Sequence, residues 1–70
     1  MPIKTEDEAR QIIKGWLDAP VPAQERSLRQ AIEETELAQM YYEQKGNDNG
    51  VARCGRIIDL LNDRRKNLES

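Results

Sequence analysis

The longest uninterrupted feature of the chain is residues 23–45, which contain neither glycine nor proline and lie between Pro22 and Gly46. Most of these residues are glutamine, glutamate, alanine, leucine or arginine, which favour helices. Proline is accepted in the first turn of a helix, where its missing N–H is not needed, and glycine is a common helix stop. The sequence therefore predicts one long helix over residues 23–45, to which the rest of the chain must be fitted.

A shorter helix is predicted over residues 5–18. Thr5 is a suitable N-cap, and Glu8, three residues later, completes the pattern of a capping box. The apolar residues that follow recur at helical spacing and form one stripe: Ala9, Ile12, Ile13, Trp16 and Leu17. Pro20 disfavours a helical residue before it, so the helix ends there, and residues 20–22 (Pro-Val-Pro) form a stiff elbow.

The third predicted helix covers residues 50–67, after a polar turn at residues 46–50 in which Asp48 or Asn49 provides the N-cap. Its main apolar line has the three–four spacing of a helix seam: Val51, Cys54, Ile58, Leu61, Arg65 and Leu68. No segment alternates with a period of two for long enough to indicate a strand. We expect an all-α single domain over residues 1–70: a short N-terminal helix followed by a two-helix antiparallel hairpin.

Two helices carry more apolar faces than one hairpin hides. Residues 23–45 have one stripe, from Leu28 to Tyr42, and a second group on the opposite side at Leu37, Met40 and Tyr41. The third helix has a second line beside its main one, with an apolar centre and basic ends: Arg53, Ile57, Leu60 and Arg64. This pattern is typical of an interface but also fits a wider core face. The predicted interface residues are Leu37, Tyr41, Arg53, Ile57, Leu60 and Arg64. Either the first helix or a second subunit is expected to cover Leu37 and Tyr41.

Catalytic and metal-binding patterns are missing. The chain has no histidine, and its single Cys54 lies on the apolar seam, which indicates a buried thiol. Asn47-Asp48-Asn49-Gly50 resembles part of a calcium loop, but Lys45 and Arg56 would occupy positions that need acidic ligands. Glu33 and Glu36 share an exposed face without a pocket. We therefore predict no enzyme, no metal and no cofactor.

A nucleic-acid-binding regulator is the alternative hypothesis. It would use the arginine-rich third helix, whose basic residues would contact phosphates: Arg53, Arg56, Arg64, Arg65 and Lys66. The net charge of −2 and the interleaved Asp59 and Asp63 weigh against it. Basic residues near a helix C-terminus also interact favourably with the helix dipole.

Residues 37–47, followed by Ala52, resemble the helix–turn–helix of a tetratricopeptide repeat. The spacing to Ala52 is too long and only one unit is present, whereas such repeats need several units to bury a core. The resemblance therefore reflects hairpin chemistry, and it carries over no functional residue.

The supply of apolar residues indicates self-association. Leucine, isoleucine and valine together number 14 of 70 residues, which is little for an independent core, yet they are spread over several helix faces. We predict a homo-oligomer, in the simplest case a homodimer, that also binds a protein target as a non-enzymatic interaction module. Adaptors, chaperones and inhibitors made by phages or plasmids fit this description. The chain lacks a signal-peptide pattern and an apolar run of membrane-spanning length, so a cytoplasmic location is expected.

Overall fold

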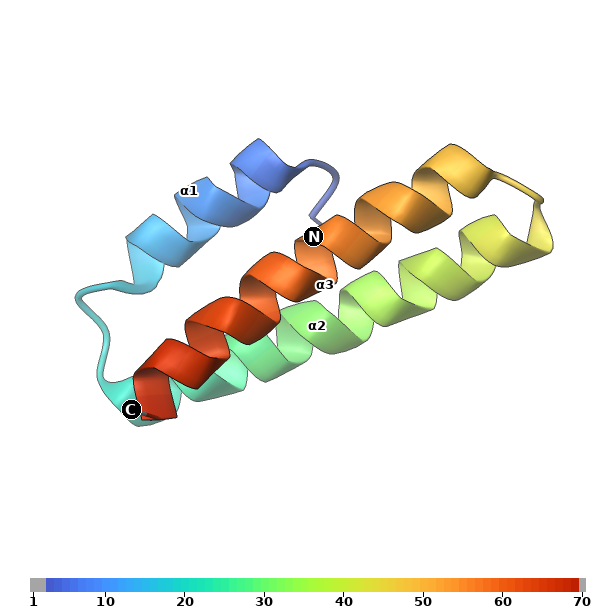
Figure 1. Cartoon of the computed structure of the whole chain (residues 1–70). Helices are drawn as coiled ribbons and strands as arrows, with labels where there is room; N and C mark the ends of the chain where they lie inside the picture. The colour runs from blue at the N-terminus through green and yellow to red at the C-terminus, as the bar shows by residue number, and fades with distance from the viewer. Residues whose placement is uncertain (1–2, 70) are drawn as a thin grey trace.

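The computed structural model describes residues 3–69, with side chains up to residue 68, and these residues form three α-helices and no strand. The helices are α1 (Glu6–Trp16), α2 (Val21–Gln44) and α3 (Asp48–Glu69). α2 and α3 pack side by side as an antiparallel hairpin, and α1 packs mainly on α3 (Figure 1). The all-helical class and the hairpin predicted from the sequence are confirmed. The ends of the predicted domain, residues 1–2 and 70, lie outside the described part.

The N-terminal helix is capped by the residues that the sequence indicated. The Thr5 side chain accepts a hydrogen bond from the Glu8 N–H at 3.1 Å, and the Glu8 carboxylate accepts one from the Lys4 N–H at 3.0 Å. Three acidic residues in the first turn interact favourably with the positive end of the helix dipole. The helix ends at Trp16, two residues earlier than predicted.

The two longer helices each begin two residues before the predicted start. Pro20 is the N-cap of α2, and its carbonyl accepts hydrogen bonds from the N–H groups of Ala23 and Gln24, both at 3.0 Å. Pro22 therefore lies inside the first turn, where a proline is tolerated. α3 is capped by Asn47, whose side-chain oxygen accepts the Gly50 N–H at 3.0 Å. Neither of the two predicted caps, one and two residues further on, has this role.

The turn between α2 and α3 is a Schellman motif. The Asn47 N–H bonds the Tyr42 carbonyl at 2.9 Å, and the Gly46 N–H bonds the Glu43 carbonyl at 3.1 Å. Gly46 has a φ of 71°, a conformation that glycine adopts without a side-chain clash. The turn therefore satisfies the last carbonyls of α2 and reverses the chain within a few residues.

The core lies where all three helices meet. Its buried apolar residues come from the N-terminal segment and from every helix: Ile3, Ala9, Leu28, Ile32, Ile57 and Leu61. α1 has 11 residues and α3 has 22, so α1 has half the length of the helix it covers. Figure 1 shows α1 alongside the half of α3 that leads to the C-terminus, while the rest of the hairpin, with its turn, extends beyond α1.

Candidate interaction surface

The outer side of α2 carries three large apolar side chains that no other part of the described chain covers. Leu37, Met40 and Tyr41 are 66%, 56% and 57% exposed. Their spacing of three and four residues places them on one face, opposite the side that packs on α3. We call this group the α2 apolar patch. α1 leaves it open, because α1 packs on α3.

Tyr41 is held in place by its neighbours on the chain. Its ring meets that of Tyr42 edge to face, with centroids 5.8 Å apart, and the Lys45 ammonium lies 5.7 Å from the Tyr41 ring centroid. Tyr42 in turn packs over Gly50 at the start of α3. Two neighbouring side chains therefore contact the exposed ring, which lowers the entropy that it would lose in a contact.

The second line of α3 splits between core and surface. Ile57 has no exposed area and belongs to the core, and Leu60 is partly buried against that core. Ile57 therefore offers no exposed area to an interface, and the line takes part in the wider core face that the sequence left as the alternative, with α1 packed on this helix. Whether this line belongs to the core or to an interface depends on where α1 packs, and the periodicity of α3 alone does not predict that position.

The two basic ends of this line also differ from each other. Arg53 is exposed. Arg64 is partly buried and donates a hydrogen bond to the Gln24 side-chain oxygen at 3.1 Å, across the hairpin. Gln24 is 5% exposed, and its amide donates to the Ala19 carbonyl at 2.7 Å, so it joins α3 to the segment between α1 and α2. Sequence reasoning missed Gln24, although its spacing of four from Leu28 places it on the core stripe.

The five basic residues of the nucleic-acid hypothesis do not all lie on one side of α3. Arg56 pairs with Glu6 of α1, whereas Arg64 and Arg65 are partly buried and each has a buried Nε without a hydrogen-bond partner. Arg53 and Lys66 are exposed but lie 13 positions apart, on different sides of the helix by the 100° rule. No continuous phosphate-binding stripe results from this arrangement.

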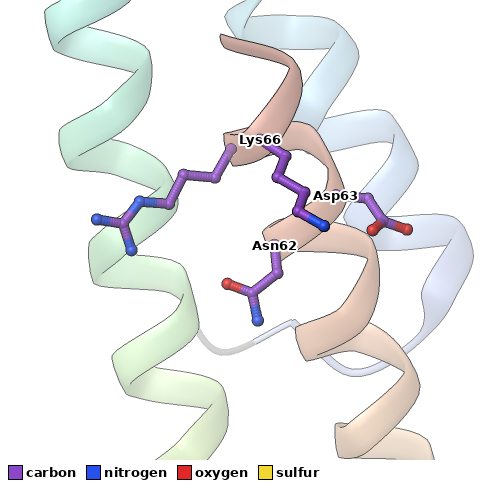
Figure 2. Close-up of a pocket in the computed structure, with 4 residues that line it drawn as sticks. Asn62, Asp63 and Lys66 are labelled. Carbon is purple, nitrogen blue, oxygen red and sulfur yellow. The ribbon is translucent and has the colours of Figure 1, made fainter. Parts of the chain in front are cut away.

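Figure 2 shows a depression at the C-terminal part of α3. Asn62, Asp63, Arg65 and Lys66 line it, and its volume is about 320 Å³. In this view the Lys66 side chain ends between Asn62 on one side and Asp63 on the other. All four residues belong to one helix, so a ligand would meet a single wall with a mixed set of charges. The depression lacks the convergent polar groups of a small-molecule site.

Nucleophilic and metal chemistry finds no support within residues 3–69. Cys54 is 4% exposed, and burial raises the pKa of its thiol above the ordinary value of 9.0, against a smaller lowering effect of the Arg53 charge. The reactive thiolate is thus disfavoured. Among the described residues, no group of three or more acidic or cysteine side chains is placed to hold a metal ion. Within the same part of the chain, no helix combines the length and the apolar character that crossing a bilayer requires.

Comparison of the chain with protein-family models, with curated proteins and with solved structures gives no match. Of the predicted interface residues, Leu37, Tyr41 and Arg53 are exposed, Leu60 and Arg64 are partly buried, and Ile57 is enclosed. Met40 completes the exposed apolar group.

Proposed function

We propose that this protein is a non-enzymatic helical interaction module that self-associates as a homodimer through the outer face of α2. The observation that carries the proposal is the α2 apolar patch. Three large side chains, each more than half exposed, stand on one helix face that the rest of the described chain leaves open. Single exposed apolar residues are ordinary on soluble proteins, but a group of them on one face is typical of a binding surface.

The chemistry of the patch suits a protein contact. Tyrosine and methionine are enriched at interfaces, since tyrosine buries a large area with a polar tip and methionine adapts to irregular surfaces. The patch is rimmed by exposed glutamates, among them Glu33, Glu36 and Glu43, as expected for an apolar centre with a polar border. An adaptor, a chaperone or an inhibitor of a larger assembly would each use such a module. A further protein target remains part of the proposal.

The proposal is tested by sedimentation of the unmodified chain and of Leu37→Glu. We expect a dimer at micromolar concentration for the unmodified chain and a folded monomer for the variant, because a buried leucine contributes about 1.5–3 kcal/mol and occurs twice in a symmetric dimer. Gln11→Glu is the matched control: it adds a carboxylate to an exposed position of α1 and should leave the dimer intact. An unmodified chain that sediments as a monomer at high concentration contradicts the proposal.

A further inference from the structure

The outer face of α2 has a charge pattern that is symmetric about its own middle. Six residues at alternating spacings of four and three lie within one narrow stripe of the helix, and all six are exposed: Pro22, Arg26, Arg29, Glu33, Glu36 and Met40. We call this stripe the α2 seam. Read in order, it is apolar, basic, basic, acidic, acidic and apolar.

Residue 31 is the centre of this pattern. Positions 22 and 40, 26 and 36, and 29 and 33 are each equally distant from it. When the α2 seams of two such helices pack antiparallel, with the two-fold axis at the level of residue 31 along the helix, each position meets its mirror position on the other copy. Every basic residue of the α2 seam then faces an acidic one, and each apolar end faces the other apolar end.

We infer that the partner of the α2 seam is a second copy of this chain, packed antiparallel with the two-fold axis on the seam side of α2, level with residue 31. This inference rests on the proposed self-association and adds its register. A two-fold dimer is isologous, so a self-complementary surface is what its symmetry requires. In this register Arg26 pairs with Glu36 of the second copy, and Arg29 with Glu33 of the second copy. Each pair occurs twice.

Charge complementarity favours this register over the simpler one in which the apolar patches meet each other. An axis between positions 38 and 39 would bring Leu37 level with Met40 of the second copy. Arg26 and Arg29 would then lie level with positions 51 and 48 of the second copy, beyond the end of its α2 at Gln44, so neither would meet a glutamate of the α2 seam. With the axis level with residue 31, Leu37 lies near Ala23 and the aliphatic stem of Arg26 of the second copy, which cover it.

Within one copy, Arg29 already has a salt bridge to Glu25, with a distance of 3.6 Å between side chains that are 57% and 38% exposed. Exposed pairs of this kind contribute little, so exchange of this partner for one across the interface costs little. Arg26 and Glu36 are ten positions apart, or about 15 Å along one helix, and they are too distant to pair within a chain. Their pairing therefore reports only on a contact between copies.

The decisive experiment uses two single variants, Arg26→Glu and Glu36→Arg, each of which places like charges at two symmetric contacts. We expect each variant alone to raise the dimer dissociation constant about tenfold or more. An equimolar mixture should restore dimerisation to within about threefold of the unmodified chain, because both contacts of the mixed dimer are then of opposite sign. If each variant alone dimerises like the unmodified chain, or if the mixture shows no recovery, the inference is overturned.

Cross-linking measures the register independently. Gln30→Cys places two thiols about 3 Å apart along the helix axes in this dimer, whereas Met40→Cys places them about 27 Å apart. We expect a short bismaleimide reagent to link the first variant and to leave the second unlinked. The unmodified chain is the control, because its Cys54 is buried. Efficient linking through Met40→Cys instead overturns the register but supports self-association, whereas a monomeric unmodified chain overturns the proposed function itself.

Discussion

The contact between Gly50 and Tyr42 makes a sharp prediction about how α2 and α3 are joined. Gly50 is buried in the first turn of α3, directly against the Tyr42 ring. A Cβ at this position would lie 2.6 Å from Cγ and 2.8 and 3.0 Å from the two Cδ atoms of that ring. Carbon atoms in favourable contact are about 3.5–4.0 Å apart, so Gly50→Ala requires the ring or the helix to move.

The expected change in the free energy of unfolding follows from two opposing effects. Alanine gains about 1 kcal/mol over glycine in a helix, whereas overpacking a tightly filled site costs about 1–3 kcal/mol. The ring cannot relieve the clash cheaply, because Cγ is its innermost atom and the Tyr42 backbone accepts the Asn47 N–H of the turn at 2.9 Å. We therefore expect Gly50→Ala to lower the free energy of unfolding by about 1 kcal/mol, and by up to about 2 kcal/mol.

The chain contains its own control for this prediction. Gly15 lies within α1, and a Cβ there has no neighbour within 4 Å. Gly15→Ala should therefore keep the helix gain and raise stability by about 0.5–1 kcal/mol. Both variants are measured by urea unfolding followed by far-ultraviolet circular dichroism, at one protein concentration because dimerisation adds to stability. Equal stability of Gly50→Ala and Gly15→Ala would refute the reasoning, since the clash alone separates them.

Two further predictions concern the core. Ile57→Ala should lower the free energy of unfolding by about 2–5 kcal/mol in the same urea assay, because the side chain is fully enclosed; a loss below about 1 kcal/mol would contradict that enclosure. Cys54 should react slowly with a thiol reagent in the folded chain and quickly in urea, and equal rates would show that it is accessible. Because burial raises its pKa, the folded state favours the protonated thiol, so this residue's contribution to stability declines as the pH rises above 9.0.

The sequence was a reliable guide where local chemistry decides the structure. Helix class, the Thr5 cap and the stop at Gly46 each follow from residues within one or two turns. The starts of α2 and α3 were predicted two residues late because the first turn accepts Pro22 and because Asn47 competes with its neighbours as a cap. These choices depend on small differences between adjacent positions, which propensity does not resolve.

The sequence did not determine which helix faces pack against one another. The outer group of α2 and the second line of α3 look alike as patterns, since both combine apolar residues with charged flanks. α1 has one apolar stripe, and α1 packs on α3, so Ile57 is enclosed while Leu37 remains exposed. The connection between α1 and α2, residues 17–20, brings α1 back over the hairpin, and this long-range step has no signature in the periodicity of either long helix.

The order of packing explains why self-association would end at a dimer. The helices form a series in which α1 packs on α3 and α3 packs on α2, and the two ends of the series differ. The outer side of α1 is polar and exposed at Asp7, Gln11 and Lys14, so it closes one end. The outer side of α2 carries the α2 apolar patch and the α2 seam, so the other end stays open. When two copies join through the outer side of α2 across a two-fold axis, a polar α1 face lies on each outer side of the dimer. The proposed dimer is therefore closed, and it offers no second copy of the seam for further growth.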